Sequence, residues 1–396
     1  MTQLDNTLLQ KIKSKASGLP KNSLVCVVGA RPNFMKIAPI IRAIKANSEQ
    51  LSVCLVHTGQ HYDEAMNKSF FNDLDIPEPD INLEVGSGSH TEQTAQVMLR
   101  FEPVVDQVQP RGVLVVGDVN STIACALVAA KKSIPIIHVE AGLRSFDRMM
   151  PEEINRVLTD QLSDYLYITE ESAEQNLLNE GIPAKRIHFA GNVMIDSLFF
   201  CKEKAIQIND TLHKHINVDD FWRPGHRFAV LTLHRPSNVD QRDVLERIID
   251  VVAEISKQLP VLFTVHPRTK NCLEQFGLKA RLDALENIKC LPPLSYLEML
   301  GLLMHATVVL TDSGGLQEET TALGVPCITL RENTERPITV DQGTNTIVGT
   351  NPELIMSTFD SIIKTGGKSG RAPNGWDGNA AQRIAEHLLR CLQISA

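Results

Sequence analysis

The sequence of 396 residues lacks several features that would mark a specialised class of protein. It has no run of 18 uncharged apolar residues, so we expect no membrane-spanning helix. Its first 22 residues lack the apolar core of a signal peptide, which predicts a cytoplasmic protein. It also lacks an excess of positive charge, since 39 Lys and Arg stand against 47 Asp and Glu for a net charge of −8. That balance argues against a general nucleic-acid-binding protein.

The eight cysteines form no CxxC pair, and most of them lie in apolar runs. Their spacing fits neither a zinc site nor a disulfide framework, so we predict reduced, buried thiols and no bound metal. The turn after the first apolar run reads GARPNFMK rather than GxGxxG, the fingerprint of a dinucleotide-binding site. The sequence therefore predicts no cofactor.

The sequence does show short apolar runs that alternate with longer helical stretches. Hydrophobic residues make up 43% of the chain and charged residues 22%, which is ordinary for a globular protein. Runs such as 24–28 and 112–116 are apolar without interruption, which is typical of strands buried on both faces. Strands alternating with helices indicate right-handed βαβ units and parallel sheets. Because the pattern restarts at 228–233, we predict two α/β halves.

The seam between the halves is predicted near 191–197 or within the more polar stretch 202–227. A helix is expected near 64–74. Apolar and small residues recur with helical spacing across 379–392, which predicts an amphipathic helix that packs back on the N-terminal half. The predicted segments are an extension (1–22), an N-terminal Rossmann-like domain (23–191), a C-terminal Rossmann-like domain (192–375) and the C-terminal helix (376–396).

Polar residues follow the predicted strands of the first half, at the sheet edge where open α/β folds bind ligands. Arg31 and Lys36 stand at the start of a helix, a position that suits an anion, although a solvated basic turn is the alternative. Asp118 follows 112–116 and is interpreted either as a helix N-cap or as a catalytic group.

Two further carboxylates follow in the first half. Glu140 ends an apolar strand, where a carboxylate costs free energy unless it is paired or used, and Arg144 comes soon after it. Glu152 opens a helix, and taken alone a routine helix start is the favoured interpretation. Carboxylates gathered in one cleft raise each other's pKa, so the set together with Asp118 is suited to moving protons.

The second half carries its own polar set. His234 and His266 each follow a predicted strand. The run Ser313-Gly314-Gly315 joins a strand to a helix, and its small residues let backbone amides approach a phosphate, although a tight turn is the alternative.

Two charged residues complete this set. Glu319 lies one helical turn beyond the glycines, where a carboxylate can bind the two hydroxyls of a ribose. Arg336 is expected to reach a phosphate or, alternatively, to pair with Glu332 or Glu335.

The sequence resembles the non-hydrolysing UDP-N-acetylglucosamine 2-epimerases at eight motifs, which stand in the same order as in that family. The motifs are GARPNFMKIAPI, TGQHYD, VVGDVNST, HVEAGLRS, MPEEINR, LHRPSN, LTDSGGLQEE and TERP. The resemblance implies a GT-B-like fold, in which two Rossmann-like parallel-sheet domains enclose an active-site cleft. It implies reversible C2 epimerisation of UDP-GlcNAc to UDP-ManNAc, by anti elimination of UDP to a 2-acetamidoglucal and re-addition, for cell-surface polysaccharide precursors. It also implies a homodimer and a UDP-sugar substrate.

The resemblance assigns acid–base roles to three carboxylates and places the remaining residues at the sugar, the diphosphate or the uridine. The catalytic residues are predicted to be Asp118, Glu140, Glu152 and His234; the substrate-binding residues are predicted to be Arg31, Lys36, Arg144, His266, Ser313, Gly314, Gly315, Glu319 and Arg336.

The sequence departs from the family pattern at two places. Many members have Glu where this chain has Asn33, and many have Gly-His-Arg-Arg-Glu where this chain has Leu-His-Arg-Pro-Ser. The Ser-Phe-Asp-Arg stretch after HVEAGLR resembles relatives that epimerise 2,3-diacetamido uronic acid nucleotides, so a modified sugar is one alternative. The others are a hydrolysing epimerase that yields UDP and ManNAc, a GT-B glycosyltransferase, and a nucleotide-sugar sensor without enzymatic activity.

Overall fold

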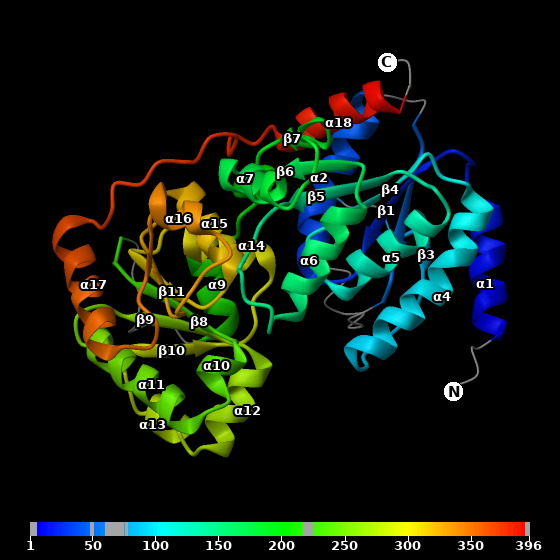
Figure 1. Ribbon diagram of the computed structural model, residues 1–396. Coiled ribbons are helices and arrows are strands. Elements are labelled where there is room, and N and C mark those ends of the chain that lie inside the picture. Colours follow the sequence, from blue (N-terminus) through cyan, green and yellow to red (C-terminus); the bar gives the residue numbers. More distant parts are fainter. Residues whose placement is uncertain (1–5, 48–50, 60–74, 76–77, 217–224, 393–396) are drawn as a thin grey trace. The chain divides into compact units, whose positions relative to one another are not determined.

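The computed structural model describes residues 6–47, 51–59, 75, 78–216 and 225–392. It divides into two compact units: unit 1 comprises Met1–Ser197 and Asn374–Ala396, and unit 2 comprises Leu198–Pro373. Each unit holds one parallel β-sheet with helices packed on it, which confirms the predicted α/β class with two sheets (Figure 1). The helix expected near 64–74 and the greater part of the motif TGQHYD lie outside the described residues.

The sheet of unit 1 has the order β3-β2-β1-β4-β5-β6-β7, and each pair of neighbouring strands is parallel. Its central strands are fully buried, as their uninterrupted apolar sequences predict. The strands are β1 (Leu24–Val28), β2 (Val53–His57), β3 (Ile81–Asn82), β4 (Gly112–Val116), β5 (Ile136–Ala141), β6 (Tyr165–Ile168) and β7 (Ile187–Phe189).

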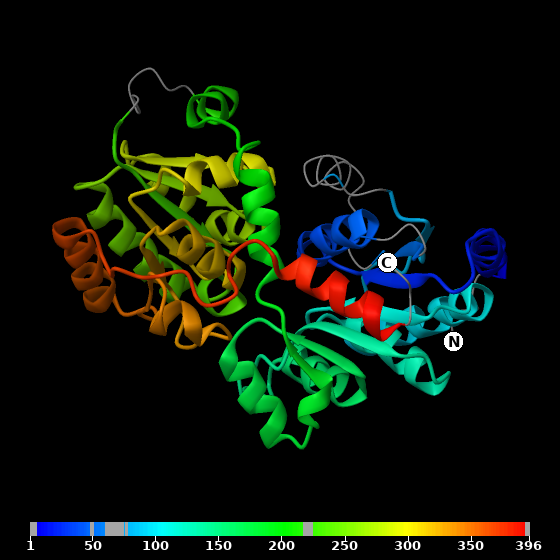
Figure 2. The ribbon, with the colours of Figure 1, turned by 90° about the horizontal axis from the view of Figure 1, so that it is seen from above.

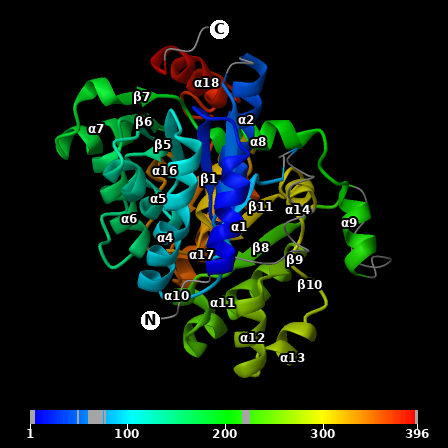
Figure 3. The ribbon, with the colours of Figure 1, turned by 90° about the vertical axis from the view of Figure 1, so that its right-hand side faces the viewer.

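The segment predicted only as an extension contains a helix of unit 1. This helix, α1, packs on α4, and its Ile12 and Ala16 are buried in the hydrophobic core to which α4 also contributes (Figure 3). At the other end of the chain α18 returns to pack against α2 (Figure 2). The helices are α1 (Asn6–Ser17), α2 (Arg31–Asn47), α4 (His90–Val108), α5 (Asn120–Lys131), α6 (Pro151–Leu162), α7 (Glu171–Asn179) and α18 (Ala380–Cys391), with α8 (Val193–Lys202) crossing the unit boundary.

The sheet of unit 2 has the order β10-β9-β8-β11-β12-β13 and is also parallel. Alternate residues of β8 enter different cores, with Leu231 and Leu233 in one and Val230 in the other, because successive side chains point to opposite faces. The strands are β8 (Ala229–Leu233), β9 (Val261–Val265), β10 (Ile288–Leu291), β11 (Val308–Thr311), β12 (Cys327–Thr329) and β13 (Asn345–Ile347).

Helices flank the second sheet on both faces. One core includes residues of α11 and α17, and the other includes residues of α9 and α14. The helices are α9 (Ile208–His215), α10 (Pro236–Val239), α11 (Arg242–Ser256), α12 (Pro267–Gln275), α13 (Lys279–Asp283), α14 (Tyr296–Leu303), α15 (Gly314–Leu323), α16 (Pro337–Asp341) and α17 (Pro352–Thr365).

Each sheet has a switch point, where the strand order turns from one direction to the other. It lies between β1 and β4 in unit 1 and between β8 and β11 in unit 2. Ligands of open α/β sheets bind beyond the carboxyl ends of strands at such points. The fold therefore directs attention to the turns that follow these four strands.

Candidate active site

The first switch point holds a buried ion pair between two predicted site residues. Lys36 on α2 lies with its Nζ 2.7 Å from Oε1 and 2.7 Å from Oε2 of Glu140, which stands near the end of β5. Only 9% of the Lys36 side chain and 2% of the Glu140 side chain are exposed. Glu140 has φ +71°, a left-handed conformation that costs a non-glycine residue free energy and often marks functional sites.

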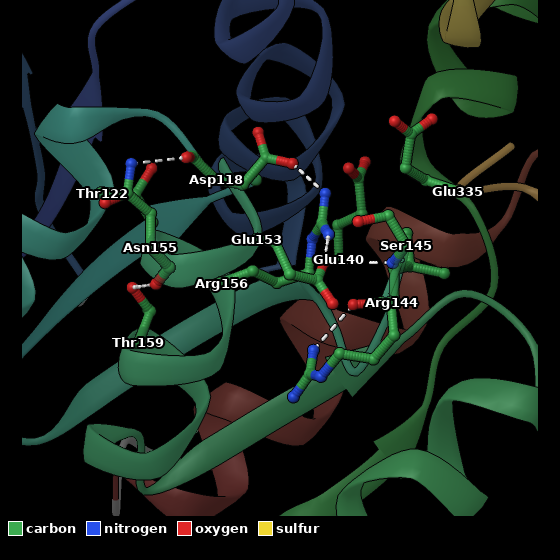
Figure 4. Close-up of polar contacts among 12 residues, drawn as sticks. Asp118, Thr122, Glu140, Arg144, Ser145, Glu153, Asn155, Arg156, Thr159 and Glu335 are labelled. Atoms are coloured by element: carbon green, nitrogen blue, oxygen red, sulfur yellow. Dashed lines mark hydrogen bonds and ion pairs between the residues drawn. The ribbon is translucent and has the colours of Figure 1, made fainter. Parts of the chain in front are cut away.

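Asp118 follows β4 on the other side of this switch point. It is not the helix cap, because the N-cap of α5 is Val119 and no side chain caps that end. Its carboxylate instead pairs with Arg156 on α6, which also binds Glu153 (Figure 4). The side chain of Asn155 donates to the Asp118 carbonyl at 3.0 Å, so α6 holds the Asp118 turn at two atoms.

The two neighbouring glutamates at the start of α6 differ in their contacts. Glu153 is buried and accepts the backbone N–H groups of Ser145 and Phe146, each at 3.0 Å. Glu152 is half-buried on the same turn. Glu153 thus holds the loop that precedes α6, and the acid–base role of Glu152 stays a prediction.

Arg144 is held inside the protein by its own contacts. Its Nη2 lies 2.7 Å from Asp160 Oδ2, and its Nε and Nη2 donate to the two oxygens of Glu180 at 2.7 and 2.6 Å. The remaining Nη1 donates to the Leu143 carbonyl at 2.7 Å, and 1% of the side chain is exposed. The structure therefore gives no support to the prediction that Arg144 contacts substrate.

Asp160 also binds His138, a residue of β5 that the sequence did not single out. His138 Nδ1 lies 2.6 Å from Asp160 Oδ1, and its Nε2 lies 2.8 Å from the Gly117 carbonyl oxygen. Burial raises the pKa of Asp160, but the neighbouring His138 and Arg144 outweigh it and hold that pKa below its ordinary value. This fully buried network ties α6 to the residue that precedes Asp118.

At the second switch point His234 follows β8 and contacts a buried carboxylate. Its Nδ1 lies 2.7 Å from Oδ1 of Asp312, which directly follows β11 and is fully buried. The His234 side chain itself is 37% exposed. The exposed ring of His266 lies 5.9 Å from the His234 ring between centroids, and its Nδ1 accepts the Arg268 N–H at 3.2 Å as the cap of α12.

The predicted phosphate turn lies at the N-terminus of α15. Ser313 is the N-cap, but its side chain makes no capping hydrogen bond. A Cβ added at Gly315 meets no described atom within 4 Å, and one at Gly314 meets only Glu335 at 3.9 Å. Both glycines have ordinary negative φ. Neither backbone conformation nor packing therefore accounts for glycine at these two positions, and the phosphate-binding role of the turn stays a prediction.

Glu319 and Arg336 are both buried in unit 2. The Nε of Arg336 donates to Glu318 Oε1 at 2.7 Å, whereas the carboxylate of Glu335 binds Arg331 at 2.8 Å. Arg336 therefore binds the Glu318 carboxylate, and of Glu335 it binds the backbone carbonyl, to which Nη1 donates at 3.3 Å.

The remaining sequence predictions concern Arg31, metal binding, membrane helices and the cysteines. Arg31 begins α2, but its side chain lies outside the described part of the chain. Among the described side chains no group of three or more His, Cys, Asp or Glu is arranged to hold a metal ion. Searched over the same residues, no helix is both long and apolar enough to cross a membrane. All eight cysteines are free, five of them buried.

The sequence is similar to known epimerases over almost all of its length. A family model described as UDP-N-acetylglucosamine 2-epimerase matches residues 42–389. The chain is 42% identical over 370 residues to the UDP-N-acetylglucosamine 2-epimerase of Methanocaldococcus jannaschii, covering 92% of this chain and 98% of that protein. It is 40% identical over 371 residues to the UDP-2,3-diacetamido-2,3-dideoxy-D-glucuronate 2-epimerase of Pseudomonas aeruginosa, covering 93% and 99%.

The fold is similar as well. The crystal structure of the Methanocaldococcus jannaschii UDP-GlcNAc 2-epimerase in complex with UDP-GlcNAc and UDP superposes with a TM-score of 0.83 at 41% identity, covering 93% of this chain and 99% of that chain. This similarity confirms the predicted GT-B-like α/β fold. The chain therefore belongs to the UDP-N-acetylglucosamine 2-epimerase family, a family of isomerases, as its motifs predicted.

Proposed function

We propose that this protein interconverts UDP-N-acetylglucosamine and UDP-N-acetylmannosamine by eliminating UDP and adding it back. The observation that carries the proposal is the pairing at the first switch point, where Glu140 lies against Lys36 and Asp118 against Arg156. Buried or half-buried carboxylates held beside cations at strand ends are equipped for proton transfer. The names of the relatives supply the substrate class.

The chemistry explains why several charged groups are needed. The C2 proton of the sugar has no adjacent carbonyl, so its direct removal is very slow. When a base takes that proton as the C1–O bond breaks, the electron pair of the C–H bond forms the C1=C2 double bond and the bonding pair leaves with UDP. The 2-acetamidoglucal then receives a proton at C2 from the opposite face, and UDP re-forms the bond to C1.

The proposal gives each unit a share of this reaction. Asp118, Glu140 and Glu152 exchange protons with the sugar, and Arg31 and Lys36 offset the negative charge of the diphosphate. In unit 2 the open N-terminus of α15 binds phosphate, Glu319 binds the ribose and His234 contacts the diphosphate. The residue ranges 23–191 and 192–375 remain our proposed limits for the acid–base domain and the UDP-binding domain.

We further propose a cytoplasmic homodimer that forms through unit 1. Free, mostly buried cysteines are typical of proteins in a reducing compartment. Leu99, Ile154 and Leu158 are large apolar residues that are more than a third exposed on helices of unit 1. Light scattering after gel filtration tests the dimer, because Ile154→Lys together with Leu158→Lys is then expected to yield monomers.

The direct test of the activity is proton NMR of UDP-GlcNAc incubated with the protein in D2O. We expect deuterium at C2 of both epimers and no net loss of UDP-sugar. Accumulation of UDP with free ManNAc indicates a hydrolysing epimerase, and retention of protium at C2 indicates a glycosyltransferase or a sensor. Asp118→Asn is the matched variant, and it is expected to abolish exchange while leaving the affinity for UDP nearly unchanged.

One alternative substrate is favoured by a specific observation, the 40% identity to a protein named as a 2-epimerase of UDP-2,3-diacetamido-2,3-dideoxy-D-glucuronate. The same experiment with that nucleotide sugar decides between the two. We expect a higher kcat/KM with UDP-GlcNAc, and the opposite ranking assigns the protein to the uronic acid derivative.

A further inference from the structure

The turn after β8 is organised by a single buried carboxylate in unit 2. Thr232 of β8 and Thr311 of β11 are paired in register, and their hydroxyls lie 2.6 Å apart, so the two strand ends are adjacent. Asp312 is the next residue after Thr311, and none of its surface is exposed. Its Oδ1 lies 2.7 Å from His234 Nδ1. An aspartate at this depth is stable only with several donors around it.

Those donors come from the β8–α10 turn and from α10 itself. Oδ2 of Asp312 accepts the backbone N–H of His234 at 3.0 Å, that of Arg235 at 2.9 Å and the side-chain amide of Asn238 at 3.2 Å, and the His234 N–H also reaches Oδ1 at 3.2 Å. Burial raises the pKa of Asp312, but the bonds and charge from His234, together with the backbone donors, bring it below the ordinary value. The group that faces the histidine ring is thus an ionised carboxylate, which accepts hydrogen bonds and cannot donate them.

This geometry fixes the state of the histidine. We propose that Asp312 is a positioning residue, which holds His234 with a proton on Nδ1 so that Nε2 is the ring atom presented to the substrate. Because Nε2 lies on the far side of the ring from Nδ1, it is directed away from the carboxylate, and the described residues give it no hydrogen-bond partner. The inference rests on the proposed function, in which His234 contacts the diphosphate, whereas Asp312 acts only through His234.

Replacement by asparagine separates this role from simple packing. Three donors bind Oδ2, whereas Oδ1 receives only the longer His234 N–H bond besides the ring, so the amide oxygen of Asp312→Asn takes the Oδ2 position and its NH2 group faces His234 Nδ1. The ring then accepts at Nδ1 and carries its proton on Nε2. The side chains remain nearly isosteric, but the atom offered to the diphosphate changes from a site that can gain a proton to one that already donates. Inverting a tautomer in this way is a recognised route to large losses of kcat.

The test combines ring-nitrogen NMR with kinetics on the full-length protein. Nitrogen-15 spectra of the His234 ring, assigned by its loss in His234→Gln, are expected to show the Nδ1–H tautomer in the wild type and the Nε2–H tautomer in Asp312→Asn. We expect kcat for C2 exchange to fall by on the order of 100-fold or more, with KM changed by no more than about threefold. Since Asp312 acts through His234, the double variant is expected to be no slower than His234→Gln.

Asp240→Asn is the control. Asp240 is the C-cap residue of the same short helix, α10, but it is exposed and pairs with Arg268 at 2.7 Å. The tautomer of His234 and the kcat for C2 exchange are therefore expected to stay unchanged in this variant. An Nε2–H tautomer in the wild type, wild-type kcat in Asp312→Asn, or additive losses in the double variant overturns the proposal. If the wild type exchanges no deuterium, the proposed function fails, but the wild-type spectrum, recorded with and without UDP, still decides the role of Asp312.

Discussion

Each unit contains a histidine bound through Nδ1 to a fully buried aspartate, and the two pairs differ in what the other ring nitrogen does. His138 lies 2.6 Å from Asp160 and His234 lies 2.7 Å from Asp312. The Nε2 of His138 meets the Gly117 carbonyl at 2.8 Å, and its side chain is fully buried, whereas the His234 side chain is 37% exposed. The same pair of residues therefore forms a buried structural link in one sheet and leaves a partly exposed ring in the other.

A third buried aspartate shows what the histidines contribute. Asp196 on α8 accepts the N–H groups of Ala380 and Ala381 at 3.2 and 2.7 Å, and so fastens the start of α18. Burial raises its pKa to about 6, against the lowered values of Asp160 and Asp312. Two backbone donors and the charge of Arg383 thus do not offset the loss of hydration at Asp196, whereas Asp160 and Asp312, each bound to a histidine ring, have pKa values below the ordinary one.

The largest expected effect is on catalysis at the open pair. His234→Gln is expected to lower kcat for C2 exchange by on the order of 100- to 10,000-fold, because it removes a group proposed to contact the reacting diphosphate. The melting temperature is expected to change little, since the ring is partly exposed. The comparison fails if this variant loses stability and keeps its rate.

His138→Gln is expected to show the reverse pattern. Glutamine cannot bond both Asp160 and the Gly117 carbonyl, so a buried polar network is broken at a cost of about 3 kcal/mol. Urea unfolding followed by circular dichroism measures this loss. The kcat of the folded variant, taken well below its unfolding midpoint, is expected to fall far less than in His234→Gln. A variant as stable as the wild type contradicts the structural role.

Asp196 predicts a dependence of stability on pH with a definite sign. Its pKa in the folded protein is about 6 against an ordinary value of 3.8, so the folded state binds the proton more tightly. The stability that this provides is present below pH 4 and is lost as the pH rises to about 6. This loss of unfolding free energy is at most about 3 kcal/mol. Urea unfolding at pH 4 and pH 6 measures the free energy of unfolding of the wild type and of Asp196→Asn. We expect this free energy to change less with pH in the variant than in the wild type. Asp106→Asn, at an exposed site, serves as the control. If the unfolding free energy depends on pH equally in all three proteins, Asp196 is not the source of that dependence.

The smallest expected effect concerns nucleotide affinity in unit 2. Glu319→Ala is expected to weaken UDP binding by roughly tenfold, because two hydrogen bonds from ribose hydroxyls to a carboxylate are lost. Isothermal titration calorimetry with UDP measures the change. Glu353→Ala, an exposed glutamate at the start of α17 in the same unit, is the control. Unchanged affinity in Glu319→Ala removes the ribose role and leaves the comparison of the two histidines intact.

The sequence predicted the sheets well because uninterrupted apolar runs leave few alternatives to buried parallel strands. It also selected Lys36, Glu140 and Asp118, since polar residues at strand ends are informative by position alone. The same criterion applies to Asp312, which directly follows the buried strand β11. Arg156, four residues after Glu152 in the same motif, is a charged residue that the sequence alone could also have indicated as part of the site.

Other features depend on contacts that no local pattern contains. The partners of Arg144 lie 16 and 36 residues further along the chain, so its engagement with Asp160 and Glu180 is a property of the tertiary structure. Asn33 departs from the common glutamate, and its Oδ1 accepts the Gly29 and Ala30 N–H groups at 3.0 and 2.9 Å. It thereby holds the turn after β1, a role that the family comparison did not suggest.

The return of α18 to unit 1 has a consequence for the order in which the protein forms during synthesis. Unit 2 is continuous in sequence, whereas unit 1 is interrupted by it and is completed only by the stretch from Asn374. The ribosome therefore releases the whole of unit 2 before the last helix of unit 1 is available. Since domains generally fold as they emerge, the second half of the chain is expected to reach its native state before the first half does.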